Sequence, residues 1–188
     1  ITEKINVKPI HPYSVSHKLS ENLILGLKDS FSTDFTILRL SNSYGYPMEV
    51  KTNCWDLFVN NVCKQSIENK KIILNSNGEQ KRNFIAMINV CKAINHCIDL
   101  ENEMTKNEIF NLGGDWNPRI IDAAYAISKK ISIVTGNPEV EILLKVKEKC
   151  DFFDFKFNFE KIKSTGLEFR NDKEYEIKNL INFCVKNF

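Results

Sequence analysis

Strand-like and helical patterns alternate along almost the whole chain, and this alternation constrains the fold more than any other feature. Apolar residues recur at four-residue steps between 14 and 31, as on one face of a helix, and residues 35–41 then form a strand-like run. Later helices are expected at 55–67, 89–100 and 120–134, with two more after the capping residues Asn158 and Asp172. Further strands are expected at 71–75, 84–88, 109–112 and 140–146. Such alternation predicts an α/β fold with at least a partly parallel sheet.

Size and charge exclude some classes of protein. The chain has 188 residues, of which 43% are hydrophobic, and a chain of this size buries roughly 70% of its unfolded surface. Its 26 basic and 24 acidic residues are intermixed and leave a net charge of +2, so no nucleic-acid partner is expected. No apolar run reaches the roughly 18 residues that span a bilayer, and no signal-peptide pattern is present. We therefore expect a cytoplasmic protein with no membrane partner.

The cysteines favour packing over metal binding. Six are present, none belongs to a C-x-x-C pair, and most lie within apolar helical patterns, which predicts reduced, buried thiols. Cys91, His96 and Cys97 are close in sequence, but a six-residue separation places the two thiols on nearly opposite sides of a helix. No second pair of ligands accompanies them, so no metal site is expected.

The segment with the most chemical content is residues 11–22, His-Pro-Tyr-Ser-Val-Ser-His-Lys-Leu-Ser-Glu-Asn. Tyr13 and His17 are four residues apart and share a helix face, whereas Lys18 lies about 140° around the helix from Tyr13. A cation beside a phenol lowers the pKa of the phenol from about 10 and lets it exchange protons near neutral pH. The spacing alone fits an acid–base pair, and it also fits a structural contact, which is the commoner case.

The surrounding sequence resembles a known family. The pattern Pro-Tyr-x-x-Ser-x-x-x-x-Glu, followed by Leu-Arg-Leu-Ser-Asn-Ser-Tyr-Gly at 38–45, resembles the extended short-chain dehydrogenase/reductase family of nucleotide-sugar epimerases, dehydratases and reductases. Residues 75–85 with Asn89-Val90 are similar to its Gly-x-x-x-Arg-Asp-Phe-Val segment, and residues 110–114 are similar to its Tyr-Asn-Val-Gly strand end. The four matches occur in the family's order and cover most of the chain.

The resemblance implies roles for four residues. Tyr13 would be the catalytic tyrosine, and His17 would take the place of the lysine that binds the nicotinamide ribose and lowers the pKa of the tyrosine. Asn42 would contact the nucleotide sugar, and Arg82 would hold its diphosphate. Without the family context Asn42 reads as a strand-end turn residue and Arg82 as a surface arginine, while Arg39, inside a strand, reads as a paired structural ion. The resemblance also implies NAD or NADP as cofactor and a homodimer formed through the Tyr13 helix.

Two departures from the family pattern qualify these roles. A histidine at position 17 offers a hydrogen-bond donor but little permanent charge near pH 7, which leaves an active variant, a weakened enzyme or a binding protein that kept the fold. The seven glycines form neither G-x-x-G-x-x-G nor G-x-G-x-x-G, the turn that receives a dinucleotide pyrophosphate. Because the family places that turn before the tyrosine, we expect the C-terminal portion of a longer enzyme, inactive in isolation.

The expected architecture is a partial Rossmann-like sheet with a smaller C-terminal α/β lobe for the substrate. Residues 1–45 and 84–115 would complete the cofactor-binding sheet, and residues 46–83 and 116–188 would build the nucleotide-sugar lobe. The expected function is that of an NAD(P)-dependent nucleotide-sugar epimerase, dehydratase or reductase in which Tyr13 is the acid–base group. The alternative is a non-catalytic protein that binds a nucleotide sugar or assists assembly.

Overall fold

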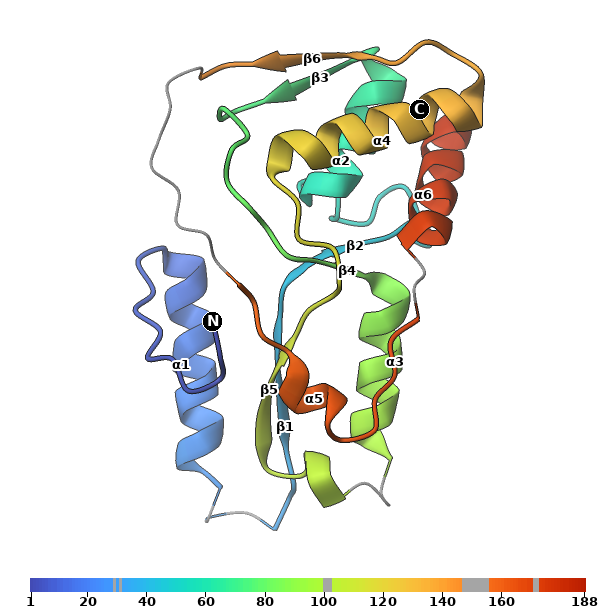
Figure 1. Ribbon diagram of the computed structural model, residues 1–188. Helices are drawn as coiled ribbons and strands as arrows, with labels where there is room; N and C mark the ends of the chain where they lie inside the picture. The colour runs from blue at the N-terminus through green and yellow to red at the C-terminus, as the bar shows by residue number, and fades with distance from the viewer. Residues whose placement is uncertain (29, 31, 100–102, 147–155, 171–172) are drawn as a thin grey trace.

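A computed structural model describes residues 1–28, 30, 32–99, 103–146, 156–170 and 173–188 (Figure 1). The structure is mixed α/β, as the alternation predicts. Its helices are α1 (Pro12–Gly26), α2 (Phe58–Glu68), α3 (Met87–Ile98), α4 (Ile120–Thr135), α5 (Glu160–Lys163), α6 (Lys173–Asn187) and the 3-10 turn η1 (Glu103–Thr105). Its strands are β1 (Thr36–Leu40), β2 (Asn42–Tyr44), β3 (Lys71–Leu74), β4 (Phe84–Ala86), β5 (Glu108–Leu112) and β6 (Glu141–Leu144).

The strands form three parallel pairs. β1 pairs with β5, from Thr36 opposite Glu108 to Leu40 opposite Leu112, while β2 pairs with β4 and β3 pairs with β6. In Figure 1 the β1–β5 pair lies between α1 and α3, and the β3–β6 pair crosses the far end of the molecule beyond α2 and α4. The predicted parallel pairing is therefore confirmed for the described strands.

Two apolar clusters hold most of these elements together, and α1 belongs to neither. The larger contains buried residues of β2, α2, β3, β4, α4 and α6, and the smaller contains buried residues of β4, α3, β5 and the segment 159–167. They meet at β4, where Phe84 belongs to the first cluster and Ile85 to the second, because successive strand side chains point to opposite faces.

The start of α1 is set locally. His11 is its N-cap and its Nδ1 accepts a hydrogen bond from the Tyr13 backbone N–H at 3.3 Å, while Pro12 occupies the first turn, where a missing N–H costs nothing. Neither Ser14 nor Ser16, the serines of the first turns, is the cap. The Ser14 hydroxyl donates instead to the His11 carbonyl at 2.8 Å.

The helices also differ from expectation in which side chains they bury and in how they are capped. Some apolar residues of the later helices face outward, since Val185 of α6 is 50% exposed, and Ile94 and Ile98 of α3 are also exposed. The N-cap of α5 is Phe159 and not the expected Asn158, although Oδ1 of Asn158 accepts a hydrogen bond from the Glu160 N–H at 3.0 Å. Asp172, the other expected cap, lies outside the described residues.

The described part of the chain carries free cysteines, as expected, and its helices are short. The five cysteines in it are free thiols, and Cys63 and Cys184 are buried in the larger cluster. None of its helices is both long and apolar enough to cross a membrane.

Candidate active site

Tyr13 and His17 lie together on an accessible face of α1. Their ring centroids are 4.3 Å apart with the ring planes tilted by 47°, as the four-residue spacing predicts. Tyr13 is 69% exposed, so its phenol is open to a ligand rather than packed in hydrocarbon. The expectation that the two rings share a face is thus met by the geometry.

A cavity of about 560 Å³ opens beside this pair, between α1 and β1. Tyr13, His17 and Glu21 belong to its helical wall, and residues 37–40 of β1 belong to the opposite wall. The carboxyl ends of parallel strands are where open α/β sheets bind ligands. The cavity extends to Leu40 at the carboxyl end of β1, which is where a ligand site is expected in this fold.

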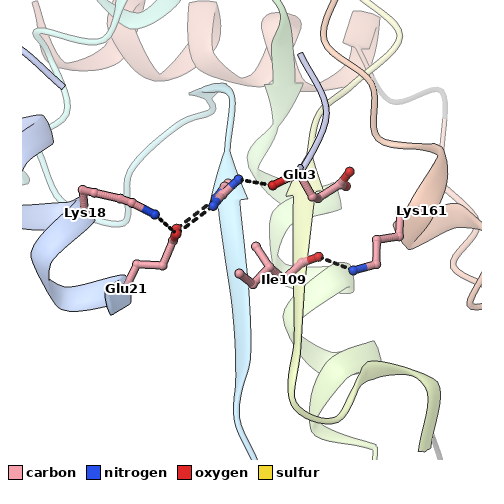
Figure 2. A network of polar contacts seen from close by, with 6 residues as sticks. Glu3, Lys18, Glu21, Ile109 and Lys161 are labelled. Carbon is pink, nitrogen blue, oxygen red and sulfur yellow. Dashed lines mark hydrogen bonds and ion pairs between the residues drawn. The ribbon is translucent and has the colours of Figure 1, made fainter. Parts of the chain in front are cut away.

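Lys18 does not stand beside Tyr13. Its Nζ lies 2.7 Å from Oε1 of Glu21, on the side of the helix that faces β1 (Figure 2). The helix register is therefore the one that pairs Tyr13 with His17. A shifted register, which would have substituted Lys18 for the family's lysine, is not what the structure adopts.

Glu21 links α1 to β1 through Arg39. Nε of Arg39 donates to Oε2 of Glu21 at 2.8 Å and Nη2 donates to Oε1 at 2.7 Å, which makes a bidentate pair. The hydrogen bonds from Arg39, reinforced by Lys18, lower the pKa of Glu21 to about 2 against the opposing effect of burial. The same carboxylate raises the pKa of Arg39. Arg39 is thus the paired structural ion that its place in a strand suggested.

The outer edge of β5 is covered by charged groups from elsewhere in the chain. Oε1 of Glu3 accepts from the Asn111 backbone N–H at 2.9 Å. Nζ of Lys161 donates to the Ile109 carbonyl at 2.8 Å (Figure 2). The third guanidinium nitrogen of Arg39, Nη1, donates to the Glu3 carbonyl at 2.9 Å. The bonds from Glu3 and Lys161 pair the Asn111 N–H and the Ile109 carbonyl of β5, which an exposed edge strand would leave without a protein partner.

Asn42 and Arg82 lie close to each other on neighbouring segments. Asn42 begins β2, and its Nδ2 donates to the carbonyl of Asn83, the residue after Arg82, at 2.9 Å. Arg82 is exposed and its Nη2 donates to Oε1 of Gln80 at 3.0 Å. Asn42 follows the cavity wall by two residues, whereas no described contact joins Arg82 to Tyr13. Tyr13 and His17 are thus in contact, whereas Asn42 contacts the residue next to Arg82 and not Arg82 itself in the described contacts.

The sequence did not indicate that Glu21 contacts Arg39. Eighteen residues separate them, so helix or strand periodicity does not connect them. The available signal was an arginine in the middle of a buried strand, because such a charge requires a carboxylate from a packed neighbour.

A family model and curated relatives match the chain. The model of the NAD dependent epimerase/dehydratase family matches residues 1–113, which include all four predicted site residues. Mouse dTDP-D-glucose 4,6-dehydratase is 24% identical over 186 residues, which are 96% of this chain and 49% of that protein. The chain spans about half the length of the curated relatives it matches.

Solved structures share the fold. UDP-glucuronic acid 4-epimerase from Bacillus cereus, in complex with UDP-glucuronic acid and NAD, has a TM-score of 0.79 at 17% identity, over 100% of this chain and 57% of that one. RMD from Pseudomonas aeruginosa, complexed with NADPH, has a TM-score of 0.80 at 13% identity, over 100% and 61%. These likenesses confirm the Rossmann-like α/β fold expected from the sequence. Because the family model matches residues 1–113, more than half of the chain, including the α1 and β1 walls of the cavity, the chain belongs to the NAD-dependent epimerase/dehydratase family.

Proposed function

We propose that this chain supplies the acid–base and sugar-binding part of an NAD(P)-dependent nucleotide-sugar epimerase, dehydratase or reductase. The observation that carries the proposal is the accessible Tyr13–His17 pair, 4.3 Å between ring centroids, on the wall of the α1–β1 cavity. The family match spans this pair and supports the assignment.

Each proposed role follows from the chemistry of its side chain. Tyr13 Oη takes the proton of a sugar hydroxyl, and His17 donates a hydrogen bond to a hydroxyl of the nicotinamide ribose. The planar guanidinium of Arg82 holds two oxygens of the sugar-nucleotide diphosphate and keeps its charge at any working pH. Asn42 contacts the sugar nucleotide. Bound NAD(P) supplies the acceptor for the hydride that leaves the sugar carbon.

The residues of this chain fit one end of that cofactor. Tyr13 and His17 are exposed beside a cavity of about 560 Å³, which leaves room for a nicotinamide ribose. The pyrophosphate requires a Gly-rich turn before a helix, and the seven glycines of the chain form no such motif. We therefore assign to this chain the ribose contact and no pyrophosphate contact.

Nucleotide-sugar binding tests the proposal through Arg82. Calorimetric titration with UDP-glucose and with dTDP-glucose is expected to show binding of one of them. Arg82→Ala is expected to weaken that binding by about tenfold to a hundredfold, because charge-assisted hydrogen bonds contribute about 1.5–3 kcal/mol. Arg170→Ala is the matched control, since Arg170 is exposed and its described contacts with Asn89 come from its backbone. Equal losses in both variants, or no binding of either sugar, would contradict the proposal.

A non-catalytic binding protein is the second candidate. The observation that favours it is His17, which stands beside the phenol where the family has a permanently charged lysine. That candidate predicts sugar binding of wild-type strength with no NAD(P)-dependent turnover in any form of the protein.

We propose that α1 also forms a homodimer interface. Leu19 and Leu23 are 62% and 64% exposed on the helix face opposite Glu21, and exposed apolar stripes of this kind commonly mark interfaces. Leu23→Glu is expected to shift the protein from dimer to monomer in sedimentation equilibrium. A wild-type protein that sediments as a monomer at all concentrations would remove the interface.

The division of the chain remains a proposal as well. Residues 1–45 and 84–115 are assigned to the cofactor-binding sheet, and residues 46–83 and 116–188 to the nucleotide-sugar lobe. The segment 159–167 also packs against β5 and α3, so the two parts share one of the apolar clusters. A cytoplasmic location likewise stays a prediction.

A further inference from the structure

Apolar packing does not hold α1 to the rest of the described protein. Neither apolar cluster includes a residue of α1, and the one buried residue of this helix is Glu21. Leu19 and Leu23, which an ordinary surface helix would turn inward, are more than 60% exposed. A helix of 15 residues is marginal by itself in water, so its attachment to the sheet decides whether it persists.

The attachment is ionic. Glu21 and Arg39 meet through two parallel hydrogen bonds of 2.8 Å and 2.7 Å, and their side chains are only 10% and 19% exposed. Lys18 adds a second cation to the same carboxylate, and the Glu3 carbonyl occupies the remaining face of the guanidinium (Figure 2). Removing Glu21 leaves the partly buried Arg39 guanidinium without its carboxylate, and removing Arg39 leaves Glu21 with Lys18 alone, so either loss is more damaging than losing an exposed pair.

We infer that the Glu21–Arg39 pair is the anchor that positions the Tyr13 helix on β1 and so holds the Tyr13–His17 face at the wall of the cavity. Its role in the reaction rests on the proposed function. Glu21 and Arg39 touch neither substrate nor cofactor in this scheme. They are positioning residues that act through Tyr13 and His17.

The inference predicts local release of one helix. Both apolar clusters remain intact when the pair is broken, because neither uses α1. Glu21→Gln keeps the size of the side chain and removes its charge, and Arg39→Gln removes the charge and shortens the side chain. In either variant α1 leaves β1 and loses helical structure, while α4, whose inner face lies in the larger cluster, stays folded.

Amide hydrogen exchange measured by mass spectrometry tests the anchor itself. Peptides from α1 are expected to exchange at least about tenfold faster in Glu21→Gln and Arg39→Gln than in the wild type, with α4 peptides unchanged. Arg39→Lys, which keeps the charge but loses the planar fork, is expected to be intermediate. Lys130→Gln is the control, because it removes an exposed ion pair to Glu174, and neither helix should change. Unchanged exchange in α1, or equal acceleration in α1 and α4, overturns the anchor.

A split between two affinities tests the positioning role. In the enzyme form that binds both ligands, Glu21→Gln is expected to weaken NAD binding by about tenfold, since α1 carries His17, and to leave UDP-sugar binding unchanged, since Asn42 and Arg82 lie elsewhere. A general loss of structure would weaken both NAD binding and UDP-sugar binding. If α1 is released selectively but NAD affinity and turnover do not change, the assignment of Tyr13 and His17 under the proposed function is wrong. If the hydrogen exchange of α1 does not change, the anchor is wrong, whatever the activity of the variant.

Discussion

Tyr13→Phe is expected to reduce NAD(P)-dependent turnover of a nucleotide sugar by about 10²- to 10⁴-fold, the range that a positioned acid–base group contributes. Phenylalanine keeps the ring that contacts His17 and removes the hydroxyl that exchanges the proton. Tyr13 is 69% exposed and belongs to neither apolar cluster, so the free energy of unfolding should change by no more than about 0.5 kcal/mol. Steady-state kinetics with UDP-glucose or dTDP-glucose, in a form of the protein that binds NAD(P), measures the effect.

Tyr125→Phe is the matched control for this loss. Tyr125 lies on α4, is 56% exposed and belongs to neither apolar cluster, so the same chemical change there should leave both turnover and stability as they were. Turnover of Tyr13→Phe within a factor of a few of the wild type would remove Tyr13 from the mechanism.

Gly114→Ala is expected to lower the free energy of unfolding more than an alanine at any other glycine of the chain. A Cβ at this position would lie 2.4 Å from the Phe84 carbonyl oxygen and 3.1 Å from the Ile85 Cα, and both are backbone atoms of β4 that cannot swing aside. The side chain of Asn83 also clasps Gly114, donating to its carbonyl at 2.7 Å and accepting from its N–H at 3.0 Å. Overpacking of this kind costs about 3 kcal/mol, which corresponds to a fall in Tm of roughly 6–12 °C.

Gly26→Ala controls for the loss of a glycine as such. Gly26 is the last residue of α1 and has nothing within 4 Å of the added Cβ, so alanine there should be neutral or mildly stabilising. Thermal unfolding of the two variants decides the matter. A Gly114→Ala protein with the Tm of Gly26→Ala would mean that β4 and the segment after β5 do not cross as closely as the structure has them.

The helices and most strands could be predicted because periodicity is local. The four-residue steps from 14 correspond to a helix only as far as Gly26, and Leu19 and Leu23 on the face they mark are exposed, while Glu21 faces the sheet instead. Periodicity tells which residues share a face and not what that face meets. β2 was missed for a related reason, since the short run Asn42–Tyr44 becomes a strand only by pairing with β4.

The site divides in the same way. The Tyr13–His17 contact follows from helix geometry and was therefore predictable from spacing. The nearness of Asn42 to Arg82 depends on the parallel β2–β4 pairing, and the Glu21–Arg39 contact depends on how α1 docks on β1. Neither relation is encoded in a short window of sequence, so family resemblance suggested the first and only the structure showed the second.

The most direct test of the central claim separates binding from proton transfer in one variant. Calorimetry should show that Tyr13→Phe binds the UDP-sugar as tightly as the wild type, because Asn42 and Arg82 are unchanged. Stopped-flow absorbance should then show no formation of reduced nicotinamide after mixing with that sugar. Formation of reduced nicotinamide at the wild-type rate would contradict the account.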